Sequence, residues 1–175
     1  MSYSSPSLSP RHLRDHVIKP VLTHCAGDDA RGFDSPAAVE LVLGTAAHES
    51  KLRALDQITG PNDGTLGPAF GLWQMEGPTH DDIWRNFLLH RHGLAARIRA
   101  MQGEFPHPHH QLVTNLAYGA AMCRAHYFRR PEPLPAAGDL AGQAAYWKRH
   151  YNTSAGKGTP DQYVRDWREL VAPYL

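Results

Sequence analysis

The chain lacks the features that mark several large classes of protein. It has two cysteines among its 175 residues, Cys25 and Cys123, and they lie far apart in sequence. Two cysteines do not make the disulfide framework of a small secreted domain, so we expect free buried thiols, with a single bridge as the alternative. The sequence also has no run of about 18 apolar residues, so no membrane-spanning helix is predicted.

A charge excess of one sign is also missing. The chain carries 18 Lys and Arg against 17 Asp and Glu, a formal net charge of +1, so no global field predicts binding to nucleic acid. Residues 83–131 nevertheless contain seven arginines and a single acidic residue, Glu104. We interpret this segment as a solvated helical surface, and binding of an anionic polymer is the alternative.

The first ten residues are rich in Ser and Pro and contain no apolar segment, so they do not predict a secretory signal peptide. We therefore expect synthesis in the cytoplasm, with another delivery route for any target outside it. We expect residues 1–8 to be flexible and residues 9–175 to form a single domain without internal repeats.

Alternating strand patterns are scarce, whereas helix-start signals and helical spacings are frequent. A helix carrying Glu49 near its end opens at Asp34–Pro36, and a short helix starts at Thr79. Residues 59–68, dense in Gly, Pro, Asn and Asp, predict a loop, and residues 56–70 leave room for one short β-hairpin. The fold class is therefore predicted to be mostly α, with further helices at residues 11–22, 94–101, 112–128, 139–150 and 160–171.

Glu49 is the main candidate for a catalytic residue. Apolar residues precede it at the spacing of one helix face: Val39, Val42, Leu43 and Ala46. A carboxylate on that face should lie against the core, where desolvation and the negative end of the helix dipole both raise its pKa. A carboxyl group that stays protonated near neutral pH is what a general acid requires.

Two further blocks carry candidate binding residues. In Gly71–Gln74 the Gln74 amide offers both a donor and acceptors for sugar groups, and Trp73 offers a stacking face. Tyr151 and Asn152 lie where a predicted helix gives way to a Gly-containing loop. Taken alone, each block is also compatible with ordinary core packing.

Three histidines, His107, His109 and His110, follow one another closely in a Pro-rich break. No Cys or acidic cluster lies beside them in sequence, so we interpret them as solvated imidazoles and expect no metal and no cofactor. A metal-dependent hydrolase built on these histidines is kept as an alternative.

The blocks, in their order along residues 34–167, resemble the lysozyme-like superfamily, and most closely soluble lytic transglycosylases and goose-type lysozymes. Glu49-Ser50 matches the catalytic Glu-Ser pair of that family, and Gly71–Gln74 matches its Gly-Leu-Met-Gln in three of four positions. The third match is to a helix of the family, in which Asn115, Leu116, Gly119 and Arg124 occupy matching positions. The fourth match is to an Ala-Tyr-Asn-Ala-Gly block of the family, in which Tyr151 and Asn152 match. Departures include Trp73 for Met and a longer separation between Glu49 and Gln74.

The resemblance implies a lysozyme-like helical domain whose cleft binds peptidoglycan glycan strands. It implies cleavage of the β-1,4 bond between N-acetylmuramic acid and N-acetylglucosamine, with Glu49 as acid and base of a lytic transglycosylase. Ser50, Gln74, Tyr151 and Asn152 would hold the sugar N-acetyl groups and orient Glu49, and Trp73 would shape a subsite. A muramidase would need a second carboxylate, for which Asp63 and Glu76 are the candidates.

A wall-degrading domain without an export signal fits a bacteriophage protein, either carried in the virion or tail with other phage proteins or released at lysis. We favour the virion. The remaining alternative is a virion structural protein that binds glycan without cleaving it.

Overall fold

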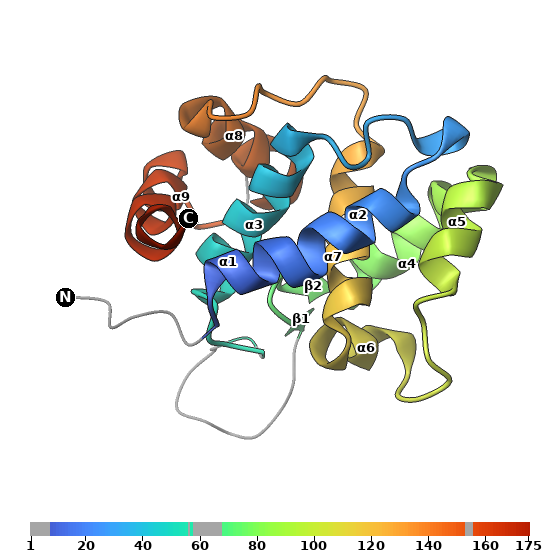
Figure 1. Cartoon of the computed structure of the whole chain (residues 1–175). Helices are drawn as coiled ribbons and strands as arrows, with labels where there is room; N and C mark the ends of the chain where they lie inside the picture. Colours follow the sequence, from blue (N-terminus) through green and yellow to red (C-terminus); the bar gives the residue numbers. More distant parts are fainter. Residues whose placement is uncertain (1–7, 56, 58–67, 153–155) are drawn as a thin grey trace.

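A computed structural model of the chain describes residues 8–55, 57, 68–152 and 156–175. Helices account for most of it, and a two-stranded antiparallel sheet is the sheet structure of the described part (Figure 1). The predicted mostly α fold with one small hairpin is therefore confirmed.

The N-terminal helix is continuous in three parts, α1 (Pro10–His12), a π-helical stretch (Leu13–Ile18) and α2 (Lys19–Cys25). Ser9 begins it, since its Oγ accepts a hydrogen bond from the His12 N–H. Pro20 has no N–H to donate and its ring crowds the preceding turn, which is consistent with the wider π-helical stretch before it. The helix predicted at residues 11–22 thus continues to Cys25.

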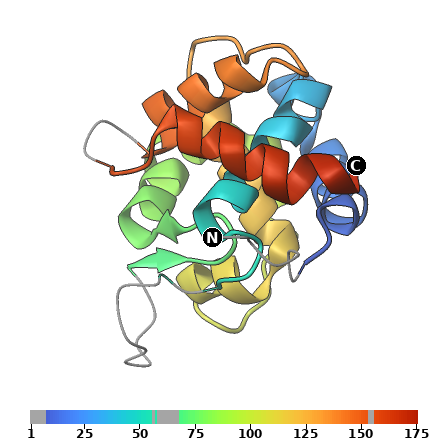
Figure 2. The ribbon, with the colours of Figure 1, turned by 90° about the vertical axis from the view of Figure 1, so that its left-hand side faces the viewer.

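The central helix is α3 (Pro36–Ser50), which contacts α7, α8, α9 and the π-helical stretch of the first helix (Figures 1 and 2). The Ser35 Oγ accepts from the Ala38 N–H and so caps its start, as the Ser-Pro pair predicts. Residues on nearly all sides of α3 are buried, and not only those of the predicted apolar stripe. Glu49 therefore belongs to a helix that lies within the core. The helix ends at Ser50, and the residue that follows it, Lys51, has a left-handed φ of 54°.

The hairpin pairs β1 (Ala69–Phe70) with β2 (Met75–Glu76), with Phe70 opposite Met75 (Figure 2). Gly71 makes the turn possible: its φ is +70°, and a Cβ there would collide with the backbone carbonyl of Leu112. The predicted range 56–70 is therefore too early, because only β1 falls inside it. Residues 56 and 58–67 lie outside the described part of the chain.

The middle of the chain forms four helices, α4 (Gly77–Asn86), α5 (His92–Arg99), α6 (Pro108–Thr114) and α7 (Leu116–Phe128). The prediction of one helix over residues 112–128 is wrong, because Asn115 is extended and separates two helices. Its Oδ1 accepts from the Tyr118 N–H and caps α7. The prediction that a helix starts at Thr79 is late by two residues, since α4 begins at Gly77 with Glu76 as its N-cap residue.

The C-terminal part consists of α8 (Leu140–Trp147) and α9 (Pro160–Asp166), each followed by a π-helical stretch, Lys148–Asn152 and Trp167–Val171. Thr159 and Gln162 form a capping box that fixes the start of α9. Three short 3₁₀ segments complete the described elements: Asp28–Ala30, Leu88–His90 and Ala172–Tyr174.

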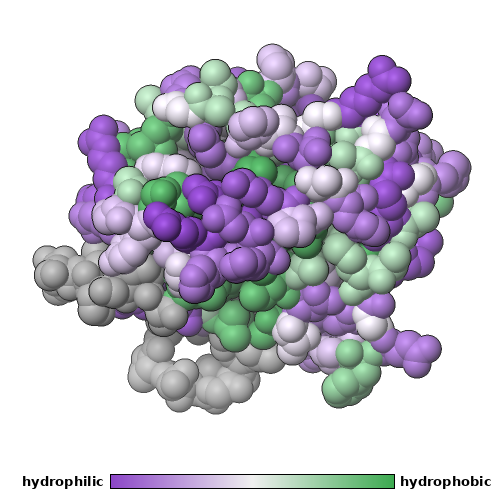
Figure 3. All heavy atoms as spheres, viewed as in Figure 1, coloured by the Kyte–Doolittle hydropathy of each residue, from purple (hydrophilic) through white to green (hydrophobic). Residues whose placement is uncertain are grey.

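The described elements share one cluster of buried side chains. Cys25 and Cys123 are both free and buried, which confirms the expected thiols. Among the described residues no helix is long and apolar enough to cross a membrane. The face shown in Figure 3 is mainly hydrophilic, with apolar residues scattered over it.

Candidate active site

A cavity of about 580 Å³ opens beside the C-terminal end of α3. Glu49 and Ser50 reach it from α3, Gln74 and Glu76 from the hairpin, and its other described lining residues are Lys51, Ala54, Gln57, Ala69, Met75, Thr79, His126, Tyr151, Asn152 and Gly156. Of the predicted catalytic and binding residues, the structure therefore brings Glu49, Ser50, Gln74, Glu76, Tyr151 and Asn152 together. They come from segments that lie up to about a hundred positions apart in sequence.

The Glu49 carboxyl faces this cavity and accepts a hydrogen bond of 2.8 Å from the Trp147 indole N–H at its Oε1. Burial raises the pKa of Glu49 above its ordinary value of 4.5. The hydrogen bond from Trp147 and the nearby His48 and Lys51 lower this pKa, but the effect of burial is larger. Asp166 adds to the upward shift as a like charge. The carboxyl is thus held in the protonated form over a wider pH range than an exposed one.

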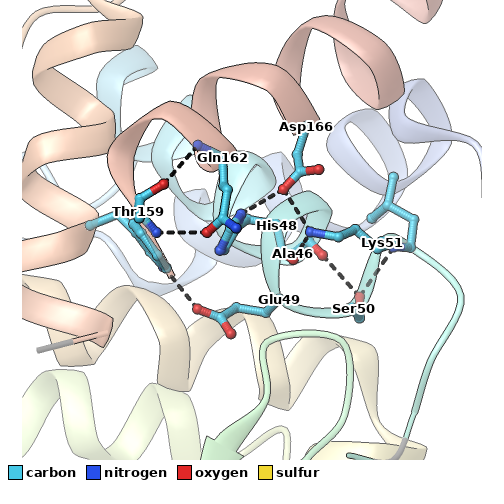
Figure 4. A network of polar contacts seen from close by, with 10 residues as sticks. Ala46, His48, Glu49, Ser50, Lys51, Thr159, Gln162 and Asp166 are labelled. Atoms are coloured by element: carbon cyan, nitrogen blue, oxygen red, sulfur yellow. Dashed lines mark hydrogen bonds and ion pairs between the residues drawn. The ribbon is translucent and has the colours of Figure 1, made fainter. Parts of the chain in front are cut away.

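The neighbours of Glu49 on α3 turn the other way (Figure 4). His48 Nδ1 and Lys51 Nζ each lie 2.6 Å from Oδ2 of Asp166 on α9, and Lys51 also donates to the His48 carbonyl. Asp166 is almost fully buried, so these two partners satisfy an acid that would otherwise be costly in the interior. The network holds the end of α3 on α9 and leaves Glu49 on the cavity side.

The Ser50 hydroxyl serves the helix end more than the cavity. It donates to the Ala46 carbonyl at 2.9 Å and accepts from the Leu52 N–H at 3.2 Å. Both bonds stabilise the sharp turn into the left-handed residues Lys51 and Leu52. Ser50 thereby fixes the direction in which Glu49 leaves the helix, and its oxygen is already engaged.

Gln74 is the polar residue of the hairpin turn that faces the cavity. Its Nε2 donates to the Gly71 carbonyl at 2.7 Å, and its Oε1 makes no hydrogen bond within the described residues. The amide is therefore oriented by its own turn and keeps an acceptor for a ligand N–H or O–H.

Trp73 does not provide the predicted stacking face. The residue is 2% exposed, and its Nε1 donates to the Val42 carbonyl of α3. The ring also lies against Gly119 of α7, where a Cβ would come within 2.9 Å of it. The helix-internal Gly119 thus allows Trp73 to tie the hairpin to the core.

Tyr151 and Asn152 bring polar groups to the cavity from the C-terminal part of the chain. Tyr151 Oη donates to the Trp73 carbonyl at 2.7 Å, which joins this segment to the hairpin. The Asn152 Oδ1 accepts from Lys148 Nζ, so its amide nitrogen is directed to other partners. Burial raises the pKa of Tyr151 well above its usual range, so the phenol stays neutral.

Of the two candidates for a second carboxylate, Glu76 lines the cavity and is exposed. It precedes α4 as the N-cap residue but makes no capping hydrogen bond, so its carboxylate is available to the cavity. The other candidate, Asp63, lies outside the described residues.

Sequence reasoning misses two residues of the site, Trp147 and His126. The sequence pattern around Trp147 indicates a core aromatic, and its contact with Glu49 spans 98 positions. His126 lines the cavity from α7; burial lowers its pKa to about 3, and the nearby Arg129 acts in the same direction. Its Nδ1 faces the donor Arg129 and its Nε2 the His150 carbonyl, so the neutral ring carries its proton on Nε2.

Comparison of the chain with protein-family models, with curated proteins and with solved structures gives no match.

Proposed function

We propose that the chain is a glycosidase that cleaves the β-1,4 bond between N-acetylmuramic acid and N-acetylglucosamine in peptidoglycan, acting as a lytic transglycosylase. The observation that carries the proposal is Glu49, a carboxyl group with a raised pKa that opens into a polar cavity of about 580 Å³. A buried acid costs stability, and a site that only bound glycan would have no need of one.

Glu49 has the properties that the two steps require. In its protonated form it donates to the glycosidic oxygen, and the carboxylate left behind is stabilised by the Trp147 N–H. That carboxylate then takes the proton of the sugar 6-hydroxyl as the 1,6-anhydro ring closes. Assistance by the substrate's own N-acetyl group replaces the second carboxylate of ordinary glycosidases.

Recognition of N-acetyl sugars is assigned to the polar groups around Glu49. The Gln74 Oε1 accepts from an acetamido N–H or a hydroxyl, and the Asn152 amide nitrogen donates to a carbonyl or hydroxyl. The neutral His126 ring is held by two hydrogen bonds and contributes shape rather than a proton.

The test is zymography on bacterial cell walls with the wild-type protein and Glu49→Gln. The substitution keeps the size of the side chain and an acceptor for the Trp147 N–H, so folding is preserved while the transferable proton is lost. We expect the rate of wall clearing to fall about 100-fold or more. Equal clearing by the two proteins would remove Glu49 from the mechanism.

A hydrolytic, goose-type lysozyme is the second candidate, and the exposed Glu76 on the same cavity favours it. Mass spectrometry of the released muropeptides separates the two reactions. Anhydro ends on every product and full activity of Glu76→Gln support the transglycosylase. Reducing ends, with activity lost in Glu76→Gln or Asp63→Asn, would support the hydrolase.

We place this activity in a bacteriophage particle, as a virion component that acts on the wall during genome entry. The placement extends the resemblance to phage wall-degrading proteins and is independent of the cavity geometry. Mass spectrometry of purified virions tests it, and failure to detect the chain there would leave release at lysis as the route.

A further inference from the structure

A group of three metal-type ligands lies outside the proposed active site, where α4 meets α6. His80 Nδ1 and His109 Nε2 lie 2.9 and 2.7 Å from the same oxygen, Oδ1 of Asp81. All three atoms are within 4.8 Å of one another. The sequence around His109 contains no acidic partner, because Asp81 is 28 positions away. The sequence around His80 also gives no sign of a metal site.

Two imidazoles and one carboxylate are the ligands that Zn²⁺ and its neighbours among the transition dications prefer. Zinc–ligand bonds of about 2.0–2.2 Å with tetrahedral angles place ligand atoms about 3.3–3.6 Å apart. The two short separations, 2.7 and 2.9 Å, would have to open by about 0.4–0.9 Å to receive such an ion. Small rotations of the side chains provide that change.

The partner of the other His80 nitrogen can serve both the free and the metal-bound state. Tyr118 Oη accepts from Trp84 Nε1 and Gln102 Nε2, so its own O–H donates to His80 Nε2, at 2.6 Å. When a metal takes Nδ1, the proton moves to Nε2 and donates to Tyr118. A flip of the Gln102 side-chain amide would then turn its Oε1 toward Tyr118 and accept a hydrogen bond from the phenol O–H, so His80 Nε2 and Tyr118 both keep partners.

The surroundings leave room for the remaining coordination positions. A cavity of about 460 Å³ borders His80 and Asp81, so water can complete the sphere. Arg99, which also lines that cavity, lies with its guanidinium over the Trp84 ring. Gly77 leaves space for the His109 ring, since a Cβ there would stand 3.0 Å from ring atoms.

We infer that His80, Asp81 and His109 form a binding site for one divalent transition-metal ion of the zinc type. The ion joins the first turns of α4 to α6, which in turn contacts β1 and α7. It therefore stabilises the side of the molecule on which the hairpin is seated. This site is separate from Glu49, and the inference does not depend on the proposed enzymatic activity.

The experiment uses untagged protein stripped with a chelator, titrated with Zn²⁺ by calorimetry and followed by thermal unfolding. We expect one ion per chain and a rise in Tm of about 5 °C or more at a hundredfold excess over the dissociation constant. Co²⁺ should give the visible absorption of a low-symmetry, nitrogen- and oxygen-ligated ion.

His109→Ala and Asp81→Asn are the test variants, and His110→Ala is the matched control because His110 is exposed on the same helix and outside the cluster. Both test variants should lose the stoichiometric ion and the Tm shift, whereas the control keeps them. The inference is overturned if wild type binds no ion one to one, or if His109→Ala binds as wild type does. If a test variant has a low Tm, its Co²⁺ spectrum is recorded at a temperature below its unfolding transition. A spectrum equal to that of the wild type would also overturn the inferred metal site.

Discussion

At the scale of single residues, the burial of Glu49 supports the proposed reaction and also carries a cost in folding stability. The same burial that raises its pKa makes ionisation unfavourable in the folded chain. In the unfolded chain the carboxyl ionises near its ordinary value of 4.5. Folding is therefore most favoured, as far as this group is concerned, when the pH is below 4.5, and the advantage is lost as the pH rises through the folded-state pKa.

This linkage predicts that Glu49→Gln is more stable than the wild type at neutral pH. The neutral amide has no charge to desolvate, so the difference in Tm between variant and wild type should be positive at about pH 7. It should shrink toward zero as the pH falls below about 4.5, where both states of the wild type are protonated. Thermal unfolding of both proteins across this range measures it, and a difference that is independent of pH would contradict the raised pKa.

The Trp147 hydrogen bond gives a second prediction at this scale. It favours the ionised Glu49, so Trp147→Phe, which keeps an aromatic ring but removes the N–H, should raise the pKa further. The proposed first step needs protonated Glu49, so activity falls as the pH rises through that pKa. The basic limb of the kcat/KM profile should therefore move to higher pH in Trp147→Phe.

Tyr146→Phe is the matched control for that profile, since Tyr146 donates to the Glu132 carbonyl and lines a different cavity. Its basic limb should coincide with that of the wild type. A shift to lower pH in Trp147→Phe would show that the indole does not act on the ionised acid.

Glu49 is accessible to sequence reasoning because the apolar residues before it and the helix end are local features. Trp147 and His126 are not, since nothing in sequence relates α7 or α8 to the end of α3. Trp73 illustrates the opposite error: an aromatic beside a candidate binding residue suggests a ligand contact, whereas its N–H is used by Val42 within the core. Pairings over long sequence separations decide these cases.

At the scale of elements, the packing of α3 on α9 depends on Gly44. A Cβ on Gly44 would collide with the Tyr163 hydroxyl, and that hydroxyl is buried without a hydrogen-bond partner among the described residues. We predict that Gly44→Ala lowers the free energy of unfolding by about 1–3 kcal/mol, since the buried ring has no room to move. Chemical denaturation measures the loss.

Tyr163→Phe should restore only part of that loss, because it removes the hydroxyl but leaves the ring Cζ 2.6 Å from the added Cβ. On its own it removes a hydroxyl without a partner and should change stability by no more than about 1 kcal/mol. In the double variant the Cβ at position 44 meets the ring but no longer the hydroxyl, so the two changes should be non-additive. Additive losses would place the strain of Gly44→Ala somewhere other than Tyr163.

The helices themselves are largely predictable because their caps are local: Ser9, Ser35 and Thr159 each begin the helix that follows. The errors fall where two signals compete. Asn115 lies within a continuous helical pattern, yet its side chain caps α7 and its extended backbone ends α6. The shift of α4 from Thr79 to Gly77 arises because strand β2 passes directly into the helix.

At the scale of the whole molecule, the arginine-rich segment is partly neutralised by acids that lie outside it. Arg97 pairs with Asp29, Arg129 pairs with Asp82, and Arg124 is buried, donating to backbone carbonyls at Gly32 and Phe33. The positive charge of residues 83–131 is thus not continuous in the fold. This favours the interpretation of a helical surface over a site for an anionic polymer.

The cavity beside Glu49 provides the last prediction, because its lining comes from α3, the hairpin, α4, α7 and the segment after α8. A ligand that fits it binds the folded chain and not the unfolded one, so it raises the free energy of unfolding. At about 100 times its dissociation constant the gain is about 2.7 kcal/mol, which corresponds to a rise in Tm of about 5–11 °C for a chain of this size.

The prediction is best tested with Glu49→Gln, which binds without turnover, and with two hexasaccharides that share a β-1,4 backbone. The hexamer of N-acetylglucosamine should raise Tm in proportion to the logarithm of its concentration once saturating. The glucose hexamer lacks the acetamido groups that Gln74 and Asn152 are proposed to bind, so it should have little effect. Equal stabilisation by both sugars would contradict that assignment. Adding Gln74→Ala should reduce the difference between the Tm shifts caused by the two sugars, because it removes an acceptor while leaving the core intact.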